Sequence, residues 1–185
     1  MANSDRKIKG TSMRIAGGYL GGRLFDAPAS YKTHPMSQQI RNALFNSLGN
    51  VSGLTVLDAY AGSGAVSFEA ASRGAHKIYA IERDPKVFKT LKDNRDKLDL
   101  EETVEVSRAN CSIWVKQQHI EFDLIIADPP YDHISEKQLN TLAKYLKGGG
   151  LFVLSHGTED KLKIKGLKKD SSNRFGNATL SFFKN

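Results

Sequence analysis

The chain has 185 residues, 39% of them hydrophobic, which is enough for one well-packed core and short for two domains. No run approaches the ~18 to 20 apolar residues of a membrane span, and residues 1–12 lack a signal peptide's apolar block. The single cysteine, Cys111, has no second cysteine with which to form a disulfide or a metal site. We therefore expect a cytoplasmic protein with no membrane partner, no metal and no redox chemistry.

The net charge of +7 is distributed unevenly along the chain. Residues 1–50 carry +5 and residues 161–185 carry +6, whereas residues 51–160 carry −4. If the fold brings the two ends to one face, that face would attract phosphate groups. Lysines that only maintain solubility explain the C-terminal charge equally well, so charge alone leaves nucleic-acid binding open.

The N-terminal quarter is predicted to form a hairpin and a helix. Strands are expected at 13–19 and 23–27, on either side of Gly21-Gly22, and a loop follows over 28–35. The stretch 37–48 is predicted to be helical, because apolar residues recur along one side of it at helical spacing. These residues are Ile40, Leu44 and Leu48.

From residue 54 onward, short apolar runs alternate with amphipathic stretches, a pattern typical of parallel strands joined by helices. Strands are predicted at 54–60, 77–81, 103–107, 122–127 and 151–154, of which 54–60 and 122–127 are expected to be buried. Helices are predicted at 65–73, 85–98, 112–118 and 138–146. Asp84 and Pro85 provide an N-cap and a first helical residue for the second of these helices. The alternation predicts a doubly wound α/β domain with a mostly parallel sheet.

The C-terminal segment is predicted to close one edge of this sheet. Gly148-Gly149-Gly150 ends the preceding helix. Beyond the fifth strand, a possible strand at 162–167 and a clearer one at 178–183 flank a turn at 173–176. Such a pair would form an antiparallel hairpin.

A turn that contains glycine follows the first core strand, in the sequence Asp58-Ala59-Tyr60-Ala61-Gly62-Ser63-Gly64. In doubly wound sheets ligands bind where strands end and helices begin, and glycine lets the backbone approach the ligand closely. Ser67 stands where a dinucleotide fingerprint would have its third glycine, and Asp58 would repel a pyrophosphate but attract an ammonium group. S-adenosylmethionine has an ammonium group and no phosphate, so the turn favours this cofactor. The alternative is an ordinary strand-to-helix turn with Asp58 as a local cap.

Glu82 ends the second core strand, 24 residues after Asp58. A carboxylate at this place can accept hydrogen bonds from both ribose hydroxyls of a nucleoside, as it does in the dinucleotide folds. Glu82 therefore predicts an adenosine-bearing cofactor, without choosing between NAD and S-adenosylmethionine. A solvated strand end in which Glu82 pairs with Arg83 is the alternative.

The segment Asp128-Pro129-Pro130-Tyr131 follows the buried strand at 122–127. Two successive prolines remove two N–H donors, so the local carbonyl oxygens and the Asp128 carboxylate present hydrogen-bond acceptors. Acceptors suit a target with two N–H hydrogens, and the Tyr131 ring offers a base a stacking contact worth ~1–3 kcal/mol. The segment therefore predicts transfer to an exocyclic amino group. The alternative is a plain turn with Tyr131 as core filler.

These segments resemble those of known enzymes. The turn at 58–64 and the DPPY segment are similar to those of the seven-stranded, class I amino-group methyltransferases. Four segments resemble the RsmD-type guanine-N2 methyltransferases of small-subunit (16S) rRNA: MRIAGGYLGGRL (13–24), THPMSQQIRNALFN (33–46), LDAYAGSGAVSFEAASRGA (57–75) and IIADPPY (125–131). The resemblance implies a Rossmann-like methyltransferase domain over 51–185, an RNA-contacting appendage over 13–50 and a flexible extension over 1–12.

The resemblance also implies roles for individual residues. S-adenosylmethionine would be bound by Asp58, Tyr60, Ala61, Gly62, Ser63, Gly64, Glu82, Arg83, Asn110 and Cys111, with Glu82 at the ribose and Asn110 and Cys111 at the adenine edge. A guanine flipped out of its stack would be held by Asp128, Pro129, Pro130 and Tyr131. Basic residues of the appendage are candidates for contacting rRNA within a small-subunit assembly particle: Arg14, Arg23, Lys32, His34 and Arg41. We expect a monomer.

The sequence departs from the family pattern at four positions. His34-Pro35-Met36 stands where the family has Arg-Pro-Thr, Asn42 stands in place of Glu, and Ser155 in place of an acidic residue. Other acceptors therefore stay open: an adenine or cytosine of DNA or RNA, or a glutamine of a protein release factor. An rRNA-binding assembly factor is the alternative without catalysis, and the absent third glycine disfavours a nicotinamide-dependent oxidoreductase.

Overall fold

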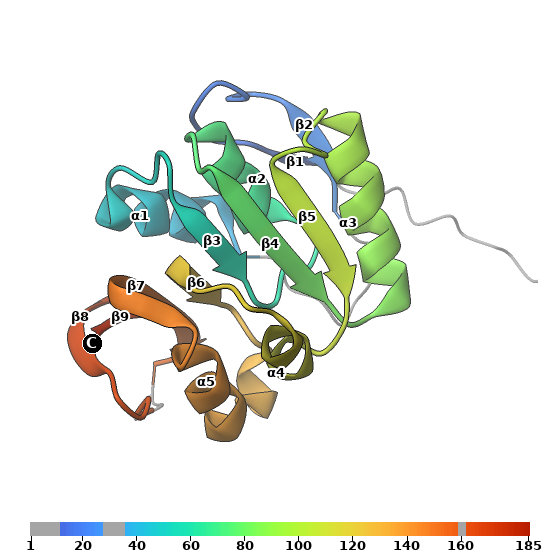
Figure 1. Ribbon diagram of the computed structural model, residues 1–185. Coiled ribbons are helices and arrows are strands. Elements are labelled where there is room, and N and C mark those ends of the chain that lie inside the picture. Colours follow the sequence, from blue (N-terminus) through green and yellow to red (C-terminus); the bar gives the residue numbers. More distant parts are fainter. Residues whose placement is uncertain (1–11, 28–35, 159–161) are drawn as a thin grey trace, which may run out of the picture.

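Seven strands form one sheet in the computed structural model, which describes residues 12–27, 36–158 and 162–185 (Figure 1). The strands are β3 (Thr55–Asp58), β4 (Lys77–Glu82), β5 (Val104–Arg108), β6 (Phe122–Ala127), β7 (Leu146–Gly157), β8 (Lys168–Phe175) and β9 (Ala178–Lys184). Their order across the sheet is β5-β4-β3-β6-β7-β9-β8. The first five are parallel, and β9 runs antiparallel to both of its neighbours. The predicted doubly wound sheet with an antiparallel C-terminal hairpin is confirmed.

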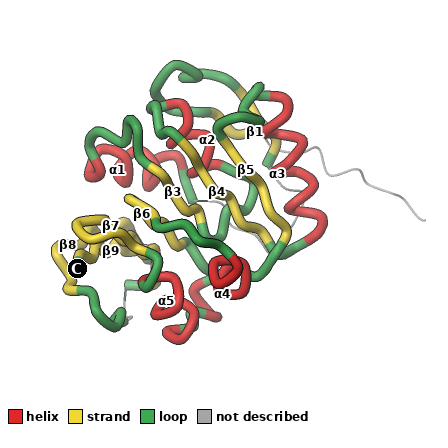
Figure 2. Tube along the Cα trace, in the orientation of Figure 1, coloured by secondary structure: helices red, strands yellow, loops and turns green. Residues whose placement is uncertain are grey.

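Side chains of the strands alternate between two cores, one on each face of the sheet. Figure 2 shows the helices arranged around the strands. On β3, Val56 belongs to the first core and Leu57 to the second. The first core is covered by the helices α1 (Gln38–Leu48), α2 (Ala65–Ser72) and α3 (Pro85–Lys97). The second is covered by α4 (Cys111–Trp114) and α5 (Glu136–Ala143).

The helices begin where the local sequence provides a cap. The Asp84 side chain accepts hydrogen bonds from the backbone N–H groups of Lys86 and Val87, and Pro85 occupies the first turn of α3. Ser37 caps α1 in the same way. These two predicted helices are confirmed to within about one residue at each end. The predicted helix at 112–118 instead begins at Cys111 and continues after Trp114 as a 3-10 turn over Val115–Gln117.

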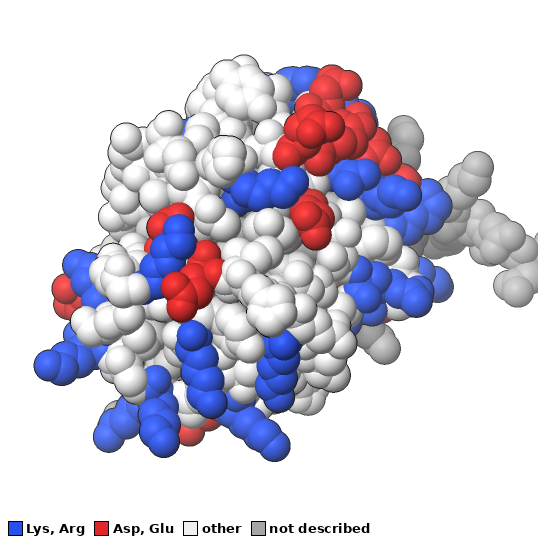
Figure 3. Space-filling model, viewed as in Figure 1, with Lys and Arg blue, Asp and Glu red and all other residues white. Residues whose placement is uncertain are grey.

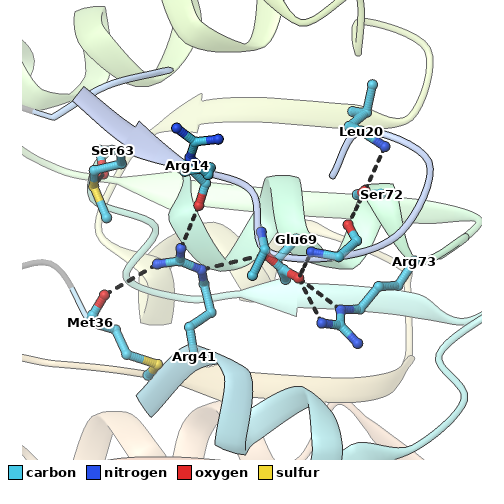
Figure 4. Close-up of polar contacts among 11 residues, drawn as sticks. Arg14, Leu20, Met36, Arg41, Ser63, Glu69, Ser72 and Arg73 are labelled. Atoms are coloured by element: carbon cyan, nitrogen blue, oxygen red, sulfur yellow. Dashed lines mark hydrogen bonds and ion pairs between the residues drawn. The ribbon is translucent and has the colours of Figure 1, made fainter. Parts of the chain in front are cut away.

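The N-terminal hairpin is shorter than predicted, with strands β1 (Ser12–Arg14) and β2 (Leu24–Asp26). The chain between them leaves the ladder because side chains of α2 accept its backbone N–H groups (Figure 4). Glu69 accepts from Ala16 and Gly17 at 2.8 and 2.9 Å, and the Ser72 hydroxyl accepts from Leu20 at 2.9 Å. The hairpin is thereby fixed to the outer side of α2.

Arg41 is buried between this hairpin and α2, with 1% of its side chain exposed. Its Nε lies 3.6 Å from a Glu69 carboxylate oxygen, and its terminal nitrogens donate to the backbone carbonyls of Arg14 and Met36 (Figure 4). A buried guanidinium requires such partners, because an unpaired charge is costly away from water. The prediction that Arg41 contacts RNA is therefore wrong, since the side chain is part of the interior.

Two predicted boundaries in the C-terminal third are also wrong. Helix α5 ends at Ala143, and Leu146, predicted as helical, already pairs with Phe122 as the first residue of β7. The next register pair joins Leu124 to Leu151, so residues 147–150 form a bulge opposite Asp123. The three glycines lie in this bulge, and Gly149 has a φ of +76° that suits glycine.

The strand predicted at 162–167 is absent from the described structure, and that segment ends in a turn at Gly166 with a φ of +84°. The strand that forms the C-terminal hairpin with β9 is β8, which includes most of the predicted turn at 173–176. The tight turn lies instead at Gly176 and Asn177. In the part of the chain that the structure describes, no helix is long and apolar enough to cross a membrane.

Candidate active site

Three acidic residues lie at one edge of the sheet, where the parallel strands β3, β4 and β6 end. Asp58 pairs in register with Ala80 of β4 and Ile126 of β6. Glu82 and Asp128 each lie two residues beyond those partners, so the three carboxyl groups follow neighbouring strand ends. Ligands bind at this edge in doubly wound folds. Among the described residues, no group of three or more His, Cys, Asp or Glu side chains is arranged to hold a metal ion.

Asp58 is buried, with 2% of its surface exposed. The Ser67 hydroxyl of α2 donates to its Oδ2 at 2.6 Å, and the Tyr60 backbone N–H also donates to it. Burial raises the pKa of Asp58 to about 7, and the nearby charges of Asp128 and Glu82 add to the rise. A carboxylate in these surroundings is stabilised by any cation placed beside it, so the site fits an ammonium group.

Glu82 is half-buried and fixed by two backbone donors. Its Oε2 accepts from the Gly62 N–H at 3.0 Å, and its Oε1 accepts from the Asp84 N–H at 2.8 Å. Each carboxylate oxygen has a second lone pair that can accept from a hydroxyl. The side chain is therefore oriented to accept the two hydroxyls of a ribose, and it also fixes the turn before α2.

The turn at 62–64 is connected to the N-terminal hairpin. Asn94 of α3 is buried; its Nδ2 donates to the Ser63 carbonyl at 3.1 Å and to the Asp26 carbonyl at 2.8 Å. Its Oδ1 accepts from the Asp26 N–H of β2 at 2.9 Å. The Ser63 hydroxyl also contacts the Met13 sulfur of β1, at 3.6 Å. Strand β1 thus contacts the turn that ends at Gly64 directly, and β2 is joined to that turn through Asn94.

Replacing Gly64 with alanine should lower the melting temperature of the protein. Gly64 has a φ of +92°, and an added Cβ would lie 2.3 Å from the Phe68 ring and 2.8 Å from a Leu91 methyl group. We expect a loss of about 2–5 kcal/mol, the combined cost of left-handed strain and overpacking, measured by thermal unfolding. Gly22→Ala is the matched control, because Gly22 has a φ of +91° and open space around it. Equal losses in both variants would contradict the role of the Phe68 contact.

Residues of α4, α5 and the loop after β3 contact one another beside these strand ends. Asn110 caps α4, and its Oδ1 accepts from the Ser112 N–H at 3.0 Å. The Tyr60 hydroxyl donates to Gln138 Oε1 at 3.0 Å and is hydrogen-bonded to the Cys111 thiol. Burial raises the pKa of both Tyr60 and Cys111, so the thiol is held in its unreactive form.

Two further predicted cofactor residues complete this region. Arg83 is exposed, and its positive charge acts on Tyr60 and Cys111 by lowering the pKa of each slightly against the effect of burial. Ala61 is buried and donates its N–H to the Ile81 carbonyl at 2.9 Å. The predicted cofactor residues thus gather around the ends of β3, β4 and β5.

The DPPY segment leaves the end of β6 and continues into a single 3-10 turn over Tyr131–His133. Pro129 is buried and Pro130 is exposed, so they mark the inner and outer sides of the segment. Burial raises the pKa of Asp128 to about 6, and a hydrogen bond from Ser155 opposes the rise. The hydroxyls of Ser155 and Tyr131 lie 2.7 Å apart. Ser155 therefore hydrogen-bonds to both Asp128 and Tyr131, the first and last residues of the segment.

The predicted RNA-contacting residues that the structure describes differ in their exposure. Arg14 is exposed, whereas Arg41 is buried. Arg23 donates to the carbonyls of Lys97 and Leu98, at 2.9 and 3.4 Å, so its guanidinium caps the C-terminus of α3. Lys32 and His34 lie outside the described residues.

Sequence reasoning missed four residues that organise the site: Ser67, Asn94, Gln138 and Ser155. Ser67 was considered only as the absence of a glycine, and Ser155 only as the absence of an acidic residue. A serine one helical turn beyond a glycine turn could have been recognised as a partner for Asp58. The single sequence holds no comparable signal for Asn94 or Gln138, because their contacts depend on how α3 and α5 pack.

This strand order, with acidic residues at the ends of neighbouring strands and a glycine turn before the first helix, defines the class I S-adenosylmethionine-dependent methyltransferases. A family described as "Conserved hypothetical protein 95" matches residues 13–184. The chain belongs to this family, the RsmD/YlbH family of S-adenosylmethionine-dependent methyltransferases.

Individual relatives and solved structures are similar over most of their length. The chain is 34% identical over 161 residues to "Ribosomal RNA small subunit methyltransferase D" of Buchnera aphidicola, which covers 84% of each chain. It is 32% identical over 157 residues to "Putative rRNA methyltransferase YlbH" of Bacillus subtilis, covering 81% of this chain and 85% of the relative. The solved structure "Putative methyltransferase yhhF" of Escherichia coli is 26% identical with a TM-score of 0.84, over 94% of this chain and 97% of that one.

Proposed function

We propose that the protein transfers a methyl group from S-adenosylmethionine to the exocyclic N2 of a guanine in small-subunit (16S) rRNA, giving N2-methylguanosine. The observation that carries the proposal is the half-buried Asp128 of the DPPY segment, which lies at the same sheet edge as Asp58 and Glu82. The names of relatives such as the Buchnera small-subunit rRNA methyltransferase support rRNA as the substrate.

The predicted cofactor residues fit S-adenosylmethionine by their chemistry. Asp58 and the turn at 62–64 would hold the methionine part, since the Asp58 carboxylate attracts its ammonium group. Glu82 would accept the ribose hydroxyls, and Asn110 and Cys111 would line the adenine edge. When bound, the cofactor supplies an electrophilic methyl group on a sulfonium.

The DPPY segment would prepare the acceptor. A guanine amino group is a poor nucleophile because its lone pair is delocalised into the ring. By accepting its two N–H hydrogens, the Asp128 carboxylate and the Pro129 carbonyl would localise that lone pair and aim it at the methyl group, so positioning and electrostatics supply most of the rate. Tyr131 would stack on the flipped base. The methylated amine loses a proton, for which the nearest acceptor is Asp128, with its raised pKa.

Ser155 would set the position of both groups. An ionised Asp128 only accepts hydrogen bonds, so the Ser155 hydroxyl donates to it. The Ser155 oxygen is then free to accept from the Tyr131 hydroxyl, 2.7 Å away. One buried serine thereby fixes the Asp128 carboxylate and the Tyr131 ring relative to each other.

Ser155→Ala should reduce transfer and move its pH dependence. The hydrogen bond from Ser155 lowers the pKa of Asp128, so its loss raises that pKa and shifts the acidic fall of kcat from near pH 6 to higher pH. We expect kcat to fall about tenfold, with cofactor affinity unchanged. The Ser155→Thr variant keeps the hydroxyl and should restore the pH profile. An unshifted profile in Ser155→Ala would contradict this role.

The substrate is tested by labelled methyl transfer to free rRNA, assembled small subunits and DNA in parallel, followed by nucleoside analysis of the product. N2-methylguanosine in the rRNA is the expected product. N6-methyladenosine, or transfer to DNA alone, would overturn the proposed substrate. The comparison of free rRNA with assembled subunits also identifies the form of the RNA that the enzyme uses.

A further inference from the structure

A row of lysines lies on the segment 162–169, which precedes β8 and includes its first two residues. Its sequence, LKIKGLKK, alternates apolar and basic residues. Ile164 is buried in the core beneath α5, together with Phe183 of β9, whereas the lysines are exposed. The alternation therefore anchors the segment from inside and presents four ammonium groups outside. These are Lys163, Lys165, Lys168 and Lys169.

Three of these lysines line a cavity of about 390 Å³ between the segment, α5 and the C-terminal strands. Asn140 of α5 faces it, and the Asn140 Oδ1 accepts from the Lys165 N–H at 2.7 Å, which fixes the segment against the helix. Phe183 contributes an apolar wall, and Glu136 is the single carboxylate among the residues that line the cavity. The volume is within the range of sites that accept small ligands or single nucleotides.

These four lysines have no carboxylate partner among the described residues, unlike other lysines nearby. Lys147 lies 2.8 Å from Asp123, and Lys184 lies 3.1 Å from Asp170. Figure 3 shows Lys and Arg side chains gathered along the lower edge of the molecule, where Figure 1 places α5 and the C-terminal segment. Exposed ammonium groups in a row suit a polyanion with regularly spaced charges.

The cavity and the active site share helix α5. Gln138 of α5 accepts a hydrogen bond from the Tyr60 hydroxyl of the loop after β3, while Glu136 and Asn140 of the same helix line the cavity. Helix α5 also begins shortly after the DPPY segment. A strand of RNA whose target base occupies the DPPY segment could therefore continue along α5 toward the lysines.

We propose that this cavity and lysine row bind the phosphodiester backbone of the rRNA that carries the target nucleotide. The inference deepens the proposed function, since it takes rRNA as the substrate. Lysine ammonium groups bind phosphates as point charges without reading sequence, and the apolar wall provides a surface for a ribose or a base. Backbone contacts of this kind hold the RNA in register while the flipped base is modified.

The test is the double charge reversal Lys163→Glu/Lys169→Glu in the full chain. We expect the KM for rRNA and the Kd for an rRNA fragment to rise about tenfold or more. The plot of the logarithm of the binding constant against the logarithm of the salt concentration should become less steep, its slope falling in magnitude by about 1.5. The kcat at saturating RNA and the cofactor affinity should not change, because neither lysine touches the cofactor site. Lys163→Gln/Lys169→Gln should give a smaller effect in the same direction.

The matched control is Lys89→Glu/Lys92→Glu, which changes the net charge equally on α3, over the opposite face of the sheet. Unchanged RNA affinity and salt slope in the first variant would overturn the proposal, as would an equal loss in the control. Weaker binding of assembled subunits without weaker binding of free rRNA would indicate a protein partner and would also overturn it. If the wild-type protein methylated no rRNA, the proposed function would fail, while the RNA-binding measurement would still decide whether the lysines bind RNA.

Discussion

Asp128→Ala should lose methyl transfer while cofactor binding persists. The carboxyl lies at the start of the DPPY segment, where it is the only charged acceptor that we assign to the target amino group. We expect the single-turnover rate to fall on the order of 10²–10³-fold, the effect of removing one preorganised hydrogen-bonding group from a water-excluded site. Calorimetry should show cofactor affinity within a few-fold of the wild type.

Asp128→Asn is the informative companion variant. Its amide oxygen still accepts one hydrogen bond, but it has no negative charge and cannot take a proton. We expect it to retain more transfer than Asp128→Ala and to lose the acidic fall in rate near pH 6. Unchanged transfer in Asp128→Ala, or abolished cofactor binding, would show that the carboxyl has a different role.

Asp58→Asn should weaken cofactor binding and stabilise the free protein. The pKa of Asp58 is raised to about 7, against 3.8 for an ordinary aspartate, so its negative charge is costly in the folded state. A carboxyl whose pKa is raised in the folded state lowers the free energy of unfolding as the pH rises from about 4 to about 7. At pH 8 this loss is complete and amounts to roughly 4 kcal/mol at most. Asparagine removes the charge, and its amide oxygen can still accept from Ser67.

The same group should make cofactor binding depend on pH. The ammonium of the cofactor is attracted by the ionised form, so wild-type affinity should be about tenfold weaker at pH 6 than at pH 8. Asp58→Asn should bind weakly and equally at both pH values, which calorimetry measures directly. A higher melting temperature at pH 8 should accompany the weaker binding. A lower melting temperature, or retained pH dependence, would contradict the placement of the cofactor ammonium at Asp58.

The N-terminal hairpin links the fold to the cofactor turn in a way that the sequence did not indicate. Basic residues of the hairpin and of α1 were predicted to contact RNA, yet the Arg41 guanidinium is buried against Glu69 and Arg23 caps α3. The hairpin instead fixes Ser63 through Asn94 and Met13. The predicted domain boundaries, monomeric state and cytoplasmic location stay predictions.

The sequence by itself determined the sheet, the caps and the reactive segments. Strand β6, the Asp84-Pro85 start of α3, the turn at 58–64 and the DPPY segment are all encoded within a few consecutive residues. Periodicity and local hydrogen-bonding chemistry act over that distance, so they could be recognised before any contact was known.

The tertiary structure alone decided which polar groups meet. The Arg41 guanidinium lies beside the buried Glu69 carboxylate, and Ser155 joins Asp128 to Tyr131. The glycine run at 148–150 forms a bulge because β7 must keep register with β6. Each of these contacts connects residues that the chain separates widely, and burial then fixes their charge and hydrogen bonds. Thus the sequence located the DPPY segment, and only packing revealed the serine that orients it.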